Sequence, residues 1–431
     1  MTRIYILFIV LFFCELSQPL KAQVRVYNPS VRSFMARVND EQLTPTVLQL
    51  GNNQQKLIIR FDGLSHSYHR FEYQIRQCNA DWTPSSMNEI DYLVGFNGNR
   101  IENYTPSLNT TLEYSHYVLS LPNEQVSLKC SGNYEVLIYD TEDDTYNSQD
   151  SPSAVARFSL LDSRVALSAN VTTNTDIDLN KSHQQLSFTA NYNALNTHNP
   201  QTELSFVVRQ NQNERTQVTD LKPTYITGSS MQFEHNRALI FAAGNEYRRF
   251  EILSHYHYGM GVSQIQLHGD YYHAELYTDK PRRNYIFDKD QNGSFLIRND
   301  DSSTDDVNTQ ADYIFVHFAF DPDDTDFSNG SIYLDGDFTR SALPYKEVTN
   351  DGYRMEFNPQ TKLYENIQLL KQGHYNYQYI YQPNQGTATP LQQLEKTEGN
   401  FYQTSNSYQI YVYYRPFGER YDALVGFLEI K

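Results

Sequence analysis

The pattern that most constrains this chain is an alternation of apolar and polar residues, repeated in short segments along its length. Six segments rich in Val, Ile, Tyr and Phe stand out: residues 56–61, 134–140, 203–210, 311–320, 375–382 and 408–414. Alternate residues of a β-strand point to opposite faces, so such a segment can bury one face. Turn-forming clusters separate the segments, and no long amphipathic helix is apparent. The sequence therefore predicts an all-β protein.

The length of 431 residues exceeds that of one sandwich domain. We expect tandem immunoglobulin-like β-sandwich domains after a leader, divided at breaks in composition near Leu161 and Arg283. An outer-membrane barrel would need an unbroken apolar band and usually an aromatic end. The irregular strand lengths, the frequent charges and the closing Ile430-Lys431 favour sandwiches. The expected segments are a signal peptide at 1–22, an N-terminal sandwich at 23–161, a middle sandwich at 162–283 and a C-terminal immunoglobulin-like domain at 284–431.

The first residues have the order of a secretory signal peptide. Arg3 precedes an apolar run at residues 4–13, and a polar stretch then leads to a small residue, Ala22. The apolar run is too short to span a bilayer. Phe13 stands before Cys14, where a lipoprotein signal needs a small residue, which argues against a lipid anchor. We expect cleavage near Ala22 and export of the mature chain.

The chain is acidic, with a formal net charge of −17 at pH 7. Removing the leader, whose Arg3, Lys21 and Glu15 sum to +1, changes −17 to −18. Such a chain repels nucleic acid phosphates and anionic lipid, so neither is an expected partner. The charge favours basic partners, although solubility alone also explains it. Direct insertion into the membrane is not expected, because no later segment is apolar enough to span it.

Two cysteines remain after the leader, Cys78 and Cys130. In an oxidising compartment they could pair and close a loop worth about 4 kcal/mol. Two thiols in a chain of this length are not a disulfide framework. The residues alone leave a bridge and two free thiols equally open.

Trp82 is the only tryptophan in a chain with 35 tyrosines. It could be a sugar platform, part of a catalytic pocket, or a buried structural anchor at the end of a strand. Asp81, Glu89 and Asp91 lie close to it in sequence and could imitate the carboxylate pair of a glycosidase. No nucleophile elbow, zinc-protease motif, phosphate loop or dinucleotide fingerprint is present. We therefore expect no enzyme, no catalytic residues and no cofactor.

One loop resembles a calcium-binding loop. Asp288, Asp290, Asn292 and Gly293 occupy its first, third, fifth and sixth places. The twelfth place, which needs a bidentate Glu, is Asn299, and the flanks are strands. A β-hairpin whose Asn-Gly pair supplies the turn is the favoured alternative. The first three are weak calcium candidates, and no metal is expected.

Histidines provide a second metal hypothesis. His255 and His257 would share one face of a strand, a spacing that can ligate zinc, and His268 and His273 follow. No cysteine is near, and neighbouring tyrosines suggest a partly solvated strand instead.

The C-terminal part resembles the glycogen-binding type of immunoglobulin-like module. Gly336, Phe338, Gly373, Tyr375 and Tyr377 fit its pattern, but Ser341 stands where that family has the tryptophan of its sugar platform. The likeness implies an architecture rather than an activity.

The chain as a whole resembles the plug protein family of the type IX secretion system in Bacteroidetes. The likeness rests on the Cys-x-Ala-Asp-Trp segment at 78–82, its Tyr-x-x-Gly-Phe continuation at 92–96, and the closing segment "YYRPFGERYDALVGF" at 413–427. It covers nearly all of the mature chain, with residues 163–280 the least diagnostic.

The resemblance implies a periplasmic protein, associated with the outer membrane through the translocon barrel of that system. It would bind the barrel as a monomer in a hetero-complex and seal its periplasmic opening while no cargo receptor is engaged. Trp82 is then interpreted as a structural anchor. The resemblance does not indicate which residues contact the barrel. The alternative function is a secreted or surface glycan-binding β-sandwich protein.

Overall fold

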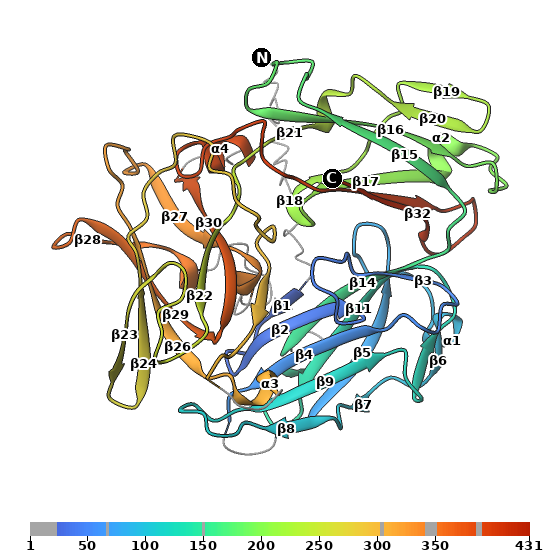
Figure 1. Ribbon diagram of the computed structural model, residues 1–431. Coiled ribbons are helices and arrows are strands. Elements are labelled where there is room, and N and C mark those ends of the chain that lie inside the picture. The colour runs from blue at the N-terminus through green and yellow to red at the C-terminus, as the bar shows by residue number, and fades with distance from the viewer. Residues whose placement is uncertain (1–23, 66–68, 149–150, 302–305, 341–350, 385–389) are drawn as a thin grey trace, which may run out of the picture.

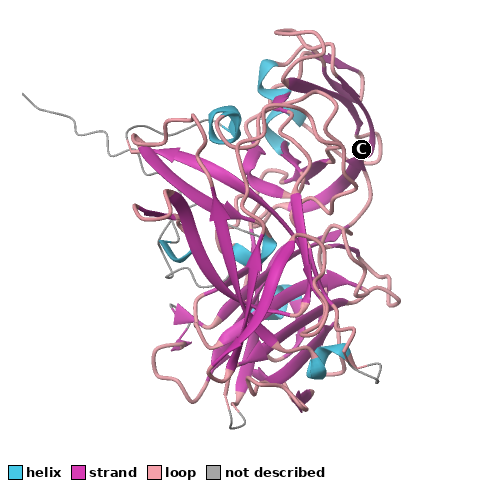
Figure 2. Ribbon diagram, turned by 60° about the vertical axis from the view of Figure 1, so that its left-hand side comes forward, coloured by secondary structure: helices cyan, strands magenta, loops and turns pink. Residues whose placement is uncertain are grey.

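The computed structural model describes residues 24–65, 69–148, 151–301, 306–340, 351–384 and 390–431. Strands dominate these residues and the helices are short, which confirms the all-β prediction (Figure 2). The strands form three β-sandwiches, each with two facing sheets around its own apolar core. The leader, including Ala22, lies outside the described residues.

The first sandwich is built from the N-terminal strands. Its core is formed by side chains such as Ile59, Phe61, Tyr73 and Val136, which face inward from both sheets. One sheet contains β1 (Val24–Val26), β14 (Ala154–Leu161), β11 (Gly132–Asp140), β5 (Phe71–Cys78), β7 (Asn99–Arg100) and β3 (Val47–Gln49). The other contains β2 (Val31–Val38), β4 (Leu57–Gly63), β9 (Ser115–Leu121) and β8 (Tyr104–Pro106). Two small ribbons pair β6 (Leu93–Gly95) with β10 (Val126–Leu128) and β12 (Asn147–Ser148) with β13 (Ser151–Pro152).

The second sandwich combines the middle of the chain with its last two strands. In its core Phe188 stacks on Phe233, and the ring of Phe206 is tilted against both. One sheet contains β15 (Ala166–Thr172), β16 (His183–Asn191), β20 (Ser230–Phe233), β19 (Tyr225–Thr227) and β21 (Ile240–Ala242). The other contains β18 (Asn213–Val218), β17 (Leu204–Gln210), β31 (Tyr408–Tyr414) and β32 (Ala423–Ile430).

The third sandwich has the most aromatic core, in which Phe250 stacks on Tyr375 and contacts Phe318 edge-on. One sheet contains β22 (Arg248–Ile252), β30 (Gly373–Pro383), β25 (Phe295–Ile297) and β27 (Gly330–Asp335). The other contains β23 (Val262–His268), β24 (Tyr271–Leu276), β26 (Tyr313–Phe320), β29 (Leu363–Lys371) and β28 (Glu356–Asn358).

Strand pairing divides the chain differently from the expected boundary near Arg283. Strands β22 to β24 precede that residue, yet they pair with β30 and β26 of the third sandwich. The last two strands lie in the expected C-terminal segment 284–431, yet β31 pairs with β17 of the second sandwich. Strand β17 pairs with β18 along one edge and with β31 along the other, so the returning chain completes this sheet. Strand β14 ends at Leu161, and the next strand, β15, begins at Ala166 in a sheet of the second sandwich.

The helical segments are brief and occur in connections. They are α1 (Glu89–Tyr92), α2 (Pro200–Glu203), α3 (Val307–Gln310), α4 (Pro390–Glu395) and the 3₁₀ turns η1 (Arg237–Leu239), η2 (Asp337–Arg340) and η3 (Asp351–Tyr353). The N-cap of α1 is Asn88. Among the described residues, no helix has the length and apolarity needed to cross a bilayer.

The three sandwiches lie around a common centre, and each contacts the other two (Figure 1). The chain runs from the first to the second sandwich, crosses to the third at residues 243–247, and crosses back between 384 and 407.

Candidate functional site

Trp82 lies in the turn that follows β5 and is buried, with 7% of its surface exposed. Its backbone has a φ of +64°, a left-handed conformation that disfavours large side chains by about 1–2 kcal/mol. The guanidinium of Arg157 lies over the indole ring, 4.7 Å from its centre. Packing and this cation–π contact must outweigh the backbone strain. The ring therefore presents no open face to a sugar.

Arg157 connects Trp82 to a buried charge network between the first and second sandwiches. Its guanidinium binds Glu135 of β11 at 2.7 Å and lies 3.6 Å from Glu214 of β18. Arg76 binds the other oxygen of Glu135 at 2.6 Å. Burial alone would raise the pKa of Glu135, but Arg157 and Arg76 outweigh it, so this pKa is lowered. The carboxylate therefore stays ionised, and Arg157 reaches from it to Glu214 of the second sandwich.

The closing segment 415–422 packs against the Trp82 turn. The backbone N–H of Ala80 donates to Asp422 at 2.8 Å, and Arg420 binds Asp91 at 2.7 Å. Tyr413 of β31 donates to Asn133 of β11 at 3.0 Å. Two segments more than 300 residues apart in sequence are thus held together at this junction.

The acids near Trp82 do not converge as a catalytic pair. Asp81 accepts hydrogen bonds from the backbone and hydroxyl of Thr83, which closes the turn. Asp91 accepts from the backbone of Asn88 and pairs with Arg420. Glu89 is exposed on α1. Their partners assign Asp81 and Asp91 to turn and helix-cap roles.

A second buried network holds the first and third sandwiches together. Lys371 of β29 donates to Asp62 of β4 at 2.6 Å, and both side chains are almost fully buried. His116 lies 2.6 Å from the other oxygen of Asp62, and Tyr313 donates to Asp62 at 2.8 Å. Burial would raise the pKa of Asp62, but Lys371 and His116 outweigh it and lower this pKa. Tyr114 extends the junction by donating to the carbonyl of Ala311 at 2.7 Å.

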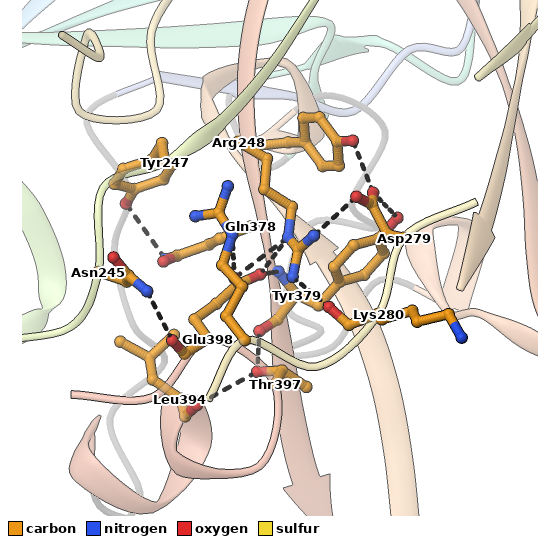
Figure 3. A network of polar contacts seen from close by, with 12 residues as sticks. Asn245, Tyr247, Arg248, Asp279, Lys280, Gln378, Tyr379, Leu394, Thr397 and Glu398 are labelled. Atoms are coloured by element: carbon orange, nitrogen blue, oxygen red, sulfur yellow. Dashed lines mark hydrogen bonds and ion pairs between the residues drawn. The ribbon is translucent and has the colours of Figure 1, made fainter. Parts of the chain in front are cut away.

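The third network lies where the chain crosses between the second and third sandwiches. Figure 3 shows Arg248 between Asp279 and Glu398, at 2.6 and 2.9 Å. Burial alone would lower the pKa of Arg248, but the two carboxylates outweigh it and raise this pKa. Tyr377 and Tyr379 donate to Asp279 at 2.7 and 2.9 Å.

Hydrogen bonds in the same region hold the two connecting segments, residues 243–247 and 390–407, in place. Asn245, in the outgoing crossing, donates to the carbonyl of Glu398 in the returning one at 3.0 Å (Figure 3). Gln184 of β16 donates to the carbonyls of Tyr402 and Thr404 at 2.9 and 2.8 Å. Arg215 of β18 also reaches Asp335 of β27 at 2.6 Å. Each pair of sandwiches is thus joined by charged or polar side chains.

Comparison with known proteins identifies the family. A model of the first domain of the type 9 secretion system plug protein matches residues 31–156. A crystal structure of a hypothetical protein from Parabacteroides merdae is 40% identical, with a TM-score of 0.86; the alignment covers 95% of this chain and 99% of that one. The chain belongs to the type 9 secretion system plug protein family. No curated protein matches.

The matched plug domain falls within the first sandwich. Its residues 31–156 begin at β2 and end within β14, and they include Trp82. Cys78 and Cys130 also lie there, and both are free in the structure. Cys78 is buried at the end of β5, and burial raises the pKa of its thiol. A thiol held neutral in this way is a poor nucleophile.

The calcium candidates of this plug family member are already engaged by other groups. Asp288 pairs with Arg249 at 2.8 Å. Asp290 accepts hydrogen bonds from the backbone N–H groups of Tyr247 and Asn292. Both Asn292 and Gly293 have positive φ, as a tight turn requires. These contacts are those of a tight turn. The described residues that flank it do not pair as the two strands of a two-residue hairpin.

The residues that resemble a carbohydrate module have structural positions. Phe338, Tyr375 and Tyr377 are buried in the core of the third sandwich. Gly336 and Gly373 lie where a side chain would clash with backbone, since an added Cβ would come 2.6 Å and 2.4 Å from carbonyl oxygens. Ser341 lies outside the described residues.

The four histidines do not form the predicted strand-face site. His255 and His257 lie in the loop between β22 and β23, where the backbone of His255 donates to Asp301. His268 and His273 lie on β23 and β24. In the described part of the chain, no group of three or more His, Cys, Asp or Glu side chains is placed to hold a metal ion.

The buried charged residues of these networks were not predicted from the sequence. Asp62, Glu135, Arg157, Arg248 and Lys371 lie on β4, β11, β14, β22 and β29, and only Glu135 falls within one of the six alternating segments. The missed signal was a charge inside an otherwise apolar strand, as at Glu135, since β11 is buried along its whole length.

Proposed function

We propose that this protein is a periplasmic plug of the type IX secretion system. It binds the outer-membrane translocon barrel and closes its periplasmic opening while no cargo receptor or cargo is engaged. Membership of the plug family carries the proposal. A leader removed near Ala22 delivers the chain to the periplasm, and its role there is structural rather than catalytic.

The interlocked sandwiches support this role. A barrel wide enough for folded cargo leaks unless a folded body blocks it without yielding. Breaking a buried ion pair costs about 3–5 kcal/mol, because a charge is left without its partner. Lys371–Asp62 and Arg157–Glu214 join the first sandwich to the third and to the second in this way, and Arg215–Asp335 joins the second to the third. The three sandwiches therefore act as one rigid body.

The surface near the Trp82 turn supplies apolar contact groups. Phe96 and Phe417 are 85% and 102% exposed, and Ile90 and Val94 are also exposed. They belong to α1, to the residues that follow it, and to the closing segment 415–422 that packs there. Exposed aromatic side chains of this kind are frequent anchors at protein interfaces. We propose this face as a contact with the barrel.

The proposal is tested by capturing the tagged full-length protein from detergent-solubilised outer membrane. We expect the translocon barrel to co-purify, and the plug to be depleted from complexes trapped with cargo, because cargo shifts the population to the open state. The acidic chain should meet basic groups, so raised salt should weaken capture. Deleting the protein should admit large hydrophilic probes, most strongly when cargo receptors are absent.

A variant pair sharpens the test. Phe96→Ser combined with Phe417→Ser should reduce capture of the barrel without altering the melting temperature. Tyr225→Ser, an exposed aromatic of β19, is the matched control and should leave capture unchanged. Enrichment on polysaccharide with no recovery of the translocon would instead support the glycan-binding alternative. The buried positions of Tyr375 and Tyr377 argue against that alternative.

A further inference from the structure

Imidazoles gather on the solvent-facing side of the sheet that contains β23, β24 and β26. Nδ1 of His273 lies 2.8 Å from Nε2 of His317. The ring of His268 is next to that of His273, with 5.2 Å between ring centres. The ring of Phe315 stacks on that of His273, with 5.0 Å between ring centres. The sequence pattern did not reveal this cluster, because His317 is more than 40 residues from His273.

The sheet fixes the positions of both imidazoles. Strands β24 and β26 pair in parallel, with His273 opposite Phe315 and Glu275 opposite His317. The neighbouring residues Ala274 and Val316 face the opposite side of the sheet and are fully buried in the core of the third sandwich. The two backbones are therefore held by strand pairing and by packing, while the imidazoles project outward.

The electrostatic surroundings keep both rings unprotonated at neutral pH. Partial burial and the neighbouring His268 lower the pKa of His273. Burial is the largest cause that lowers the pKa of His317, and the adjacent His273 lowers this pKa further. Neutral imidazoles have the lone pair that metal binding requires. Glu275 and Glu365 act in the opposite direction on His317, and their negative charge also favours a cation there.

We propose that His273 and His317 form a two-imidazole site for a divalent transition metal of the nickel, copper and zinc group. Two nitrogens bound at about 2.0 Å and at about a right angle lie roughly 2.8 Å apart, as in tetragonal copper or nickel coordination. The separation of the two imidazole nitrogens in the structure is the same. Water completes the coordination, since the site faces solvent. This site is independent of the plug function.

Metal binding would replace the hydrogen bond between the two imidazoles with two bonds to the ion. In the metal-free protein one imidazole donates its N–H to the other ring. On binding, the donor nitrogen gives up that proton by changing tautomer, with the other ring nitrogen protonated instead. Both rings then turn so that their lone pairs converge on the ion. No oxidation or reduction is involved. The ion bridges β24 and β26, and should therefore stabilise the third sandwich by binding the native state.

The test is calorimetric titration of Cu²⁺ into the full-length mature protein, without an affinity tag, at pH 7. We expect one ion per chain and a higher melting temperature with the metal. His273→Gln and His317→Gln should each weaken binding at least about tenfold, as expected when a metal site loses a supporting group. His257→Gln removes an exposed imidazole from a loop and should leave the affinity unchanged.

Two results would overturn the site. One is the absence of saturable binding to the unmutated chain. The other is equal weakening by His257→Gln, which would mean that Cu²⁺ binds exposed imidazoles without preference. The metal-free melting temperatures of the Gln variants identify any loss of fold, and a Zn²⁺ titration on the same variants repeats the comparison. Weaker binding in well-folded His273 and His317 variants alone supports the site.

Discussion

At the scale of single residues, Trp82 is a rare side chain that lies buried in a turn. The sequence offered a platform, a pocket residue or an anchor, and burial beneath Arg157 supports the anchor. The partner could not be predicted, because Arg157 lies 75 residues further along the chain and alternates with apolar residues like any surface charge. A one-dimensional pattern indicates which side chain is unusual, but not which residue packs on it.

Replacing Trp82 tests this role directly. Trp82→Ala should lower the free energy of unfolding by about 3–5 kcal/mol, the range for removing a large buried aromatic. Denaturant titration measures the change. Phe96→Ala, which removes an exposed aromatic nearby, is the control and should change stability by less than about 0.5 kcal/mol. Equal stability of the Trp82 variant and the unmutated protein would contradict the anchor.

Asp290 gives a prediction for pH. Burial raises the pKa of its carboxyl to about 6. The folded state then binds more protons than the unfolded state between about pH 4 and 6, so Asp290 favours folding at low pH and loses this contribution as pH rises through 6. The full loss is about 3 kcal/mol at most. Asp290→Asn should remove this slope.

Melting curves of both proteins from pH 4.5 to pH 7 measure the difference. As the pH rises from 4.5 to 7, the melting temperature of the Asp290→Asn variant should fall less than that of the unmutated chain. The comparison concerns this change with pH and does not depend on the stability of either protein at a single pH. Two parallel curves would show that Asp290 titrates near its ordinary pKa.

At the scale of elements, the alternating pattern of the sequence predicted the positions of individual strands. All six alternating segments fall on strands, namely β4, β11, β17, β26, β30 and β31. The pairing of β31 with β17 was not predictable, because alternation states which face a strand buries and says nothing about its neighbour. Strands on either side of the expected boundary near Arg283 therefore pair with one another.

The turn at 288–293 belongs to the same scale. Its carboxylates already bind Arg249 and backbone N–H groups, so Ca²⁺ would have to displace them, and the closing carboxylate is missing. We expect millimolar Ca²⁺ to leave the melting temperature unchanged, as measured by differential scanning fluorimetry. Mg²⁺ at equal ionic strength is the control. A rise of several degrees with Ca²⁺ alone would restore the calcium hypothesis.

At the scale of the whole molecule, the three junctions predict a single unfolding unit. Separate domains linked only by flexible segments unfold independently, whereas the first and third sandwiches here share a buried ion pair. Asp62 lies in the first sandwich, while Lys371 and Tyr313 lie in the third. Separating the two would break these hydrogen bonds and expose the buried junction to water. Calorimetry should therefore show one transition, with a van't Hoff enthalpy close to the calorimetric one.

The Asp62–Lys371 pair is the sharpest probe of that coupling. Asp62→Ala should lower stability by about 3–5 kcal/mol, because Lys371 keeps a buried charge with no carboxylate. Adding Lys371→Met removes that charge and should restore a large part of the loss, which denaturant titration of the two variants measures. Asp40→Ala breaks an exposed pair with Arg60 and should cost no more than about 1 kcal/mol. If Asp62→Ala cost as little as Asp40→Ala, the junction would contribute nothing to rigidity. The proposed closing of a barrel by one rigid body would then depend on the other two junctions.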